Sequence, residues 1–169
     1  MTTKKHLAEV AKAESQKFYH GFVMTTESTI GEIVRPFPKW TLEEADKNWC
    51  AAFVYHCCVL AGFEIPIRPK ECVSCNLAGC GAWEEFAQGD ERIAYHRPDS
   101  GYTPEAGDIV LFNKVFCDAE HDHIGIVCEN KADTIIVAEG NINNVSGVIE
   151  RRKDEHIRAY ISLPDGFAY

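Results

Sequence analysis

The C-terminal part of the chain is built from short runs of β-branched and aromatic residues separated by turn residues, and this pattern constrains the fold most. The runs are DIVLF, HIGIV, TIIVAEG, GVIERR and HIRAYISL, all of which follow residue 107. Consecutive strands joined by short turns form an antiparallel sheet. Because the helical patterns come earlier, we expect an α+β fold with N-terminal helices packed on a C-terminal antiparallel β-sheet.

The first predicted helix begins after Thr3, a good N-cap residue, and runs to Gly21, a common C-terminal stop. Leu7 and Phe18 are among the apolar positions that recur at helical spacing in this segment. Residues 22–40 contain glycine and proline without a sustained period. They predict a surface loop with room for one helical turn.

The stretch TLEEADKNWCAAFVYHCC predicts two helices in succession. Thr41 and Glu44 have the spacing of a capping box, which favours a short helical turn. Asn48 is the predicted N-cap of a second helix that ends at Gly62. Apolar residues recur in this helix at three- and four-residue intervals, so it should be buried, with Cys50 in its first turn.

The composition indicates a single domain over residues 1–169, with an irregular, cysteine-rich insertion at about 64–103 that holds one predicted helix at AWEEFAQ. The 17 Lys and Arg against 26 Asp and Glu give a net charge of −9, which disfavours binding to nucleic acid or an anionic membrane. No apolar run has the length of a signal peptide or a membrane span. We therefore expect a monomer that is made in the cytoplasm and released or exported by a non-signal route.

Cys50 is the candidate nucleophile among eight cysteines, which in a reducing compartment are expected to be free thiols, metal ligands or a nucleophile. A thiol with a pKa near 8.5 is only about 3% ionised at neutral pH. The unpaired N–H groups and the positive dipole end of a helix start favour the thiolate. Cys57 and Cys58 lie two turns further on and should be inert core residues.

A nucleophilic cysteine needs a general base, and His121 and His123 at the start of HIGIV are the candidates. We favour His123 because the apolar strand follows it directly. Asp122 beside it is expected to raise the pKa of the imidazole. The strand TIIVAEG brings Glu139 near its end, with Asn141 just beyond, and a polar group there is suited to orient the imidazole.

Four motifs in this order, WCAAFVYHCCVLAGF, TPEAGDIVLF, HIGIV and VAEGN, resemble the CHAP family of cysteine, histidine-dependent amidohydrolases and peptidases, within the NlpC-type, papain-like group. The resemblance covers about residues 45–163. It implies a papain-like fold in which Cys50 is the nucleophile, His123 the general base and Glu139 the orienting acid. Asn141 matches the polar residue that follows this acid. Asp108 belongs to a structural motif and is assigned no catalytic role.

The resemblance also implies the reaction and its substrate. A member of this family would hydrolyse an amide bond through a thioester without a cofactor. Its substrate would be peptidoglycan or a peptide-like amide, as for a lysin or an antibacterial effector. The sequence does not choose which bond is cut.

A zinc site is the competing interpretation of the insertion. Cys72 and Cys75 form a C-x-x-C step and Cys80 follows, which is compatible with three corners of a tetrahedral site. The fourth ligand would be Cys117, His121 or Cys128. Only one C-x-x-C pair is present, so the zinc signal is incomplete. The alternative functions are a non-catalytic papain-like binding module with structural zinc, or an amidase that acts on a small cytosolic amide.

Overall fold

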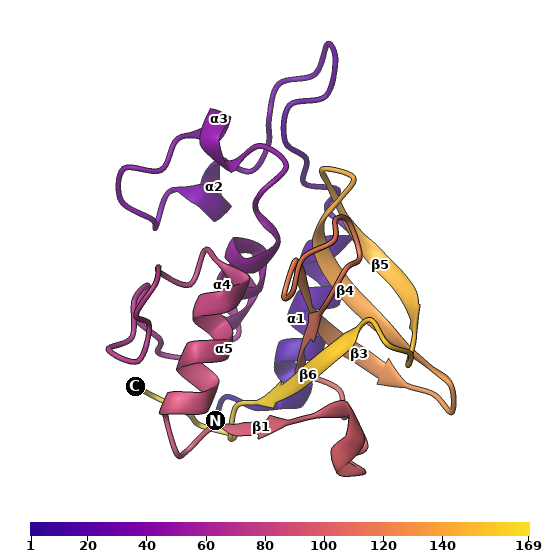
Figure 1. Ribbon diagram of the computed structural model, residues 1–169. Helices are drawn as coiled ribbons and strands as arrows, with labels where there is room; N and C mark the ends of the chain where they lie inside the picture. The colour runs from indigo at the N-terminus through magenta and orange to yellow at the C-terminus, as the bar shows by residue number, and fades with distance from the viewer.

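The computed structural model describes residues 1–169 and arranges the chain as a set of helices beside a twisted sheet (Figure 1). The helices are α1 (Lys4–Ser15), α2 (Gly31–Val34), α3 (Leu42–Ala45), α4 (Cys50–Leu60), α5 (Cys80–Gly89) and the 3₁₀ helix η1 (Pro98–Ser100). The strands are β1 (Ala94–His96), β2 (Ile109–Phe112), β3 (His123–Asn130), β4 (Thr134–Ile142), β5 (Val145–Arg152) and β6 (Ile157–Ser162). None of the helices has the length and apolar character needed to cross a membrane.

The six strands form one antiparallel sheet in the order β1-β6-β2-β3-β4-β5. The five predicted runs become β2 to β6, which confirms the α+β class expected of a papain-like domain. The additional strand β1 arises within the segment predicted to be irregular, and it pairs Ala94 with Ser162 at the edge of the sheet. The cysteine-rich insertion therefore returns the chain to the sheet instead of forming a separate unit.

The central helix α4 lies against the sheet beside α1. It packs against β3 and β4, as does α1, and α5 contacts it from the helical side (Figure 1). Trp49 and Phe53 are fully buried in the core that results. Gly140 in β4 permits this close approach, because a Cβ atom there would lie 2.5 Å from the Cβ of Phe53. The start of α4 is thus fixed beside the strands that carry the candidate base and acid.

The first helix is shorter than predicted. Thr3 caps it by accepting a hydrogen bond from the backbone N–H of His6, as expected. The helix ends at Ser15, where the hydroxyl of Ser146 donates to the Ser15 carbonyl and ties the helix end to β5. Phe18 has a φ of 55° and is 68% exposed, so its predicted place in the helix is wrong. Tertiary contacts end this helix before the apolar pattern does.

The capping box of Thr41 and Glu44 is confirmed at the start of α3. The N-cap predicted at Asn48 is wrong by one residue, because Trp49 precedes the first helical residue of α4. The indole N–H of Trp49 donates a 3.0 Å hydrogen bond to Asn144 Oδ1, and this buried contact fixes the residue before the helix. Cys50 consequently becomes the first residue of α4.

Candidate active site

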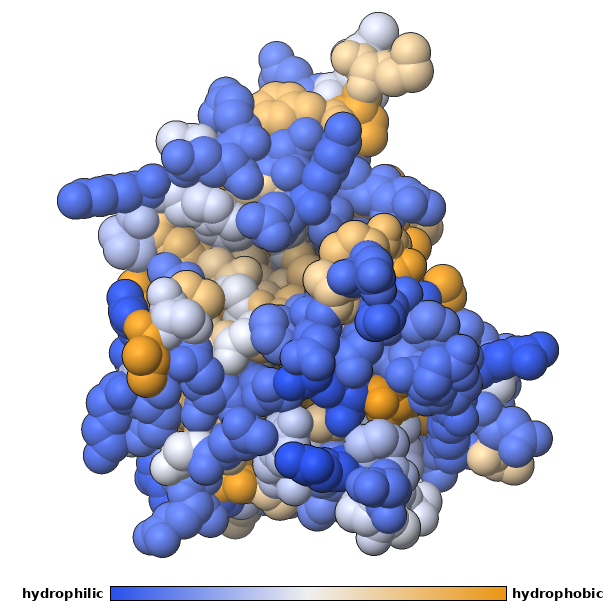
Figure 2. Space-filling model, viewed as in Figure 1, coloured by the Kyte–Doolittle hydropathy of each residue, from blue (hydrophilic) through white to orange (hydrophobic).

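Cys50 occupies the N-terminal end of α4 and faces a surface pocket. Cys50 is 7% exposed and lines a pocket of about 480 Å³. The other lining residues are Lys47, Asn48, Phe116, Cys117, Asp122, Asn141, Asn143 and Asn144. Figure 2 shows apolar surface near the start of α4 bordered by hydrophilic side chains. The backbone N–H of Cys50 has no hydrogen-bond partner in the chain, as expected for the first turn of a helix.

His123, Glu139 and Arg151 form a hydrogen-bonded chain across three neighbouring strands. His123 Nε2 is 2.7 Å from Glu139 Oε2, and both side chains are fully buried. Arg151 donates from Nε to Glu139 Oε1 at 2.8 Å and from Nη2 to Oε2 at 2.7 Å. The other ring nitrogen of His123, Nδ1, is buried without a hydrogen-bond partner. Because Glu139 occupies Nε2, Nδ1 is the nitrogen available to Cys50.

The electrostatics of the site favour a thiolate beside an imidazolium. A hydrogen bond from the Cys80 thiol lowers the pKa of Cys50 most, and His123 lowers it further, so that the pKa falls to about 5 although burial opposes this. Burial lowers the pKa of His123, but Cys50 and Glu139 outweigh it and raise the pKa to about 9. At neutral pH the pair is therefore in its ionised form.

The two cysteines further along α4 have the opposite environment. Cys57 and Cys58 are fully buried. Burial raises the pKa of both thiols above the ordinary value. They remain protonated core residues, as the sequence predicted, and only Cys50 combines a helix start with a pocket.

Asn141 lies in the pocket but does not contact the imidazole. Its side chain Nδ2 donates a 3.0 Å hydrogen bond to the backbone carbonyl of Lys47. Asn141 thereby joins the end of β4 to the segment that leads into α4. Glu139, rather than Asn141, holds the ring of His123.

His121 and Asp122, the two residues before His123, contact neighbouring backbone segments and not the Cys50 sulfur. His121 has a φ of 37° and lies beside Gly81, whose added Cβ would be 3.2 Å from its ring. The carboxylate of Asp122 accepts hydrogen bonds from the backbone N–H groups of Val115, Phe116 and Cys117. Burial raises the pKa of Asp122, but these bonds outweigh it and lower the pKa below the ordinary value. The Asp122 carboxylate and the His123 imidazole attract each other, as expected, but Cys50 and Glu139 raise the pKa of His123 most.

Comparison with known families decides the classification. The family model described as CHAP domain matches residues 43–141, which is more than half of the 169-residue chain. The chain belongs to the CHAP domain family. This makes it a member of a cysteine, histidine-dependent amidohydrolase and peptidase family, and Cys50, His123, Glu139 and Asn141 all fall within the match. The match ends before β5 and β6, and so before Arg151. No curated protein gives a significant match to the chain.

Three residues that position the CHAP site were missed from the sequence. Arg151 lies in GVIERR without a motif around it, Cys80 was placed just outside the predicted helix, and Asn144 lies in a turn rich in asparagine. Asn144 has a φ of 70°, a conformation that asparagine tolerates. Its amide accepts from the N–H groups of Trp49 and Lys47 and donates to the Asp46 carboxylate. Asn144 therefore anchors the segment that ends at Cys50.

The sulfur atoms of the predicted zinc alternative do not converge in this CHAP domain. Cys72 donates to the carbonyl of Ala82, Cys75 is exposed, and Cys80 contacts Cys50. The alternative with three cysteine ligands is therefore not supported by the geometry.

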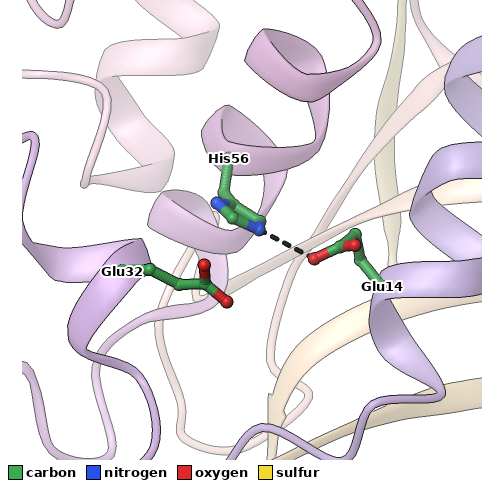
Figure 3. A group of neighbouring side chains, drawn as sticks. All are labelled: Glu14, Glu32 and His56. Carbon is green, nitrogen blue, oxygen red and sulfur yellow. Dashed lines mark hydrogen bonds and ion pairs between the residues drawn. The ribbon is translucent and has the colours of Figure 1, made fainter.

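The one group of three potential metal ligands whose atoms come together is Glu14, Glu32 and His56, from α1, α2 and α4 (Figure 3). His56 Nε2 is 2.9 Å from Glu14, and the hydroxyl of Tyr19 contacts both carboxylates. Lys17 adds an ion pair to Glu14 at 2.5 Å. These internal contacts satisfy the polar groups, so the cluster acts as a polar connection among three helices.

Proposed function

We propose that this CHAP domain hydrolyses an amide bond of peptidoglycan, either within the stem peptide or where the peptide joins the glycan. Cys50 is the nucleophile, His123 the general base and acid, and Glu139 the group that orients the imidazole. The observation that carries the proposal is the buried bond between His123 and Glu139, which leaves Nδ1 free for a cysteine at the start of a helix. The family to which the chain belongs supports the same roles.

The reaction begins when the Cys50 thiolate attacks the amide carbonyl of the substrate. The developing oxyanion accepts a hydrogen bond from the unpaired backbone N–H of Cys50, which the helix dipole reinforces. The imidazolium of His123 donates its proton to the leaving amine, and a thioester forms. Neutral His123 then takes a proton from water, which hydrolyses the thioester and regenerates the thiolate.

Glu139 contributes by holding the imidazole ring and stabilising its positive charge. Arg151 fixes the carboxylate through two hydrogen bonds, so Glu139 has little freedom to turn away. Both groups act through the ring of His123 and are positioning residues.

The pocket supports a peptide-like substrate. Asn48, Asn141 and Asn143 line it beside Cys50, and side-chain amides match the donors and acceptors of a peptide backbone. Lys47 adds a positive group at the same pocket, and its ammonium forms no ion pair within the chain. A substrate peptide with a free carboxylate would complement this ammonium.

Mass spectrometry of purified peptidoglycan fragments tests the proposal, because it detects cleavage and identifies the bond together. We expect new fragments that gain one water, and no such fragments with Cys50→Ala. Cys75→Ala is the matched control, since it removes an exposed thiol outside the pocket and should cleave like the wild type. Cleavage that persists in Cys50→Ala would contradict the mechanism.

Alkylation separates an enzyme from a non-catalytic binding module. An activated Cys50 should react with iodoacetamide at mildly acidic pH faster than the other seven cysteines. Equal rates across all of them would count against catalysis. If Cys50 reacts fast but peptidoglycan is not cleaved, the substrate must be another amide.

A further inference from the structure

Cys50 and Cys80 bring their sulfur atoms together although 30 positions separate them in the chain. The two Sγ atoms are 3.7 Å apart. Each cysteine is the first residue of a helix, α4 for Cys50 and α5 for Cys80, so the starts of two helices meet at this contact. No other pair of cysteine sulfurs lies within hydrogen-bond distance.

The remaining cysteines lack this combination of a neighbouring thiol and access to solvent. Cys57, Cys58 and Cys72 are buried, and Cys128 is half-buried with its thiol directed to backbone carbonyls. Cys75 and Cys117 are exposed, and Cys117 also lines the pocket of Cys50. Cys117 is therefore the natural competitor for any reaction of Cys50 with a second thiol.

We propose that Cys50 and Cys80 form a dithiol site that reacts with hydroperoxides and closes to a reversible disulfide. The pocket gives a small peroxide access to Cys50, and the half-buried Cys80 is in contact with it. A disulfide bond is about 2.05 Å long, so the sulfurs must approach each other by about 1.7 Å, which side-chain rotation and a small helix shift can provide. The disulfide would also stop hydrolysis, because it consumes the Cys50 thiolate, and this effect rests on the proposed function.

The chemistry balances in two steps. The Cys50 thiolate attacks the terminal oxygen of the hydroperoxide, the O–O bond breaks, and Cys50 becomes a sulfenic acid. The other oxygen leaves and takes the proton of the His123 imidazolium, as water when the peroxide is H₂O₂. Cys80 then attacks the Cys50 sulfur, the S–O bond breaks, and the departing hydroxide takes the proton of Cys80 to form water. Two thiols lose two electrons and two protons, and the peroxide is reduced. An external dithiol reverses the reaction by exchange.

The environment of Cys80 suits the second step. Contact with the Cys50 thiolate and burial both raise the pKa of Cys80 well above its ordinary value, so Cys80 stays a thiol while Cys50 is ionised. Once Cys50 is a neutral sulfenic acid, the repulsion that keeps the Cys80 proton in place is gone. Cys80 is thereby held in reserve until Cys50 has been oxidised.

Peptide mapping of the intact chain tests the proposal without an assay of hydrolysis. Reduced protein is treated with H₂O₂, its free thiols are blocked with iodoacetamide, and it is digested without reductant. Trypsin gives one peptide with Cys50 and another with Cys80, each of which holds two further cysteines, so fragmentation must assign the linked sulfurs. We expect a Cys50–Cys80 link, loss of Cys50 alkylation, and recovery of alkylation after dithiothreitol.

The variants Cys80→Ser and Cys117→Ser form a matched pair. In Cys80→Ser, Cys50 should oxidise beyond sulfenic acid, and dithiothreitol should not restore its alkylation. Cys117→Ser should form the same link as the wild type. Absence of the link in the wild type, or full recovery in Cys80→Ser, would overturn the proposal.

The measurements also separate this site from the proposed function. A link that forms in a protein without hydrolytic activity supports the dithiol site and contradicts the hydrolase. Hydrolysis that survives H₂O₂ unchanged, with no link, supports the hydrolase and overturns the dithiol site.

Discussion

Glu139→Gln should impair hydrolysis much more at alkaline pH than at acidic pH. The Glu139 carboxylate lies 2.7 Å from His123 Nε2 and helps to raise the pKa of the imidazole to about 9. Glutamine keeps the size and one acceptor oxygen, so the orientation of the ring is preserved while the negative charge is lost. Arg151 then faces the imidazolium without its carboxylate partner, which disfavours the protonated ring further.

The magnitude follows from the pKa of His123, which rises from 6.5 to about 9 through Cys50 and Glu139. If the substitution lowers this pKa to about 7, the protonated fraction at pH 8 falls from roughly 90% to roughly 10%. At pH 6 it falls only from nearly complete to roughly 90%. Because the leaving amine needs the proton of His123, the variant should lose about tenfold more activity at pH 8 than at pH 6.

The assay is kcat/KM for a soluble peptidoglycan fragment between about pH 5 and pH 9. Glu150→Gln is the matched control, since it removes the same charge from an exposed carboxylate on the neighbouring strand β5. We expect the alkaline limb of the profile to move toward neutral pH in Glu139→Gln alone. An equal loss at every pH would refute the assignment of Glu139 as the group that stabilises the imidazolium.

Three substitutions, one of them with a matched control, test the site and its support. Cys50→Ala should abolish hydrolysis with nearly unchanged thermal stability, and a large fall in the unfolding temperature would mark Cys50 as a core residue instead. Asn144→Ala removes a buried amide with several hydrogen bonds and should lower the free energy of unfolding in urea by about 2–3 kcal/mol, with reduced kcat; an unchanged midpoint would contradict its anchoring role. Gly140→Ala places a Cβ 2.5 Å from Phe53 and should cost about 1–3 kcal/mol, whereas Gly147→Ala, with its nearest atom at 3.6 Å, should cost less than about 1 kcal/mol. Equal effects in the two glycine variants would refute the close-approach argument.

The types of the main elements could be predicted from local patterns. The alternating and β-branched runs predicted β2 to β6, and the apolar periodicity around Cys50 predicted α4. Boundaries were less accurate where tertiary contacts intervene. Helix α1 ends at Ser15 although its apolar pattern continues, and α4 begins at Cys50 because Trp49 is held by Asn144.

The candidate site was predicted in part for the same reason. The sequence shows a cysteine at a helix start and a histidine at the first residue of a strand, because each of these features depends on a few neighbouring residues.

The strand β1 was missed because its three residues gain their hydrogen bonds only from β6, far along the chain.

By itself, the sequence determined the order of the main helices and of strands β2 to β6, the position of Cys50 at a helix start and membership of the CHAP family. The resemblance to the family implied that Glu139 orients His123, whereas the tertiary structure alone decided that Arg151 fixes Glu139 and that Cys80 lies against Cys50. Periodicity and capping act over a few residues, whereas the meeting of side chains depends on strand register and helix packing between distant segments. The charge state of the Cys50 sulfur is therefore a property of the folded chain.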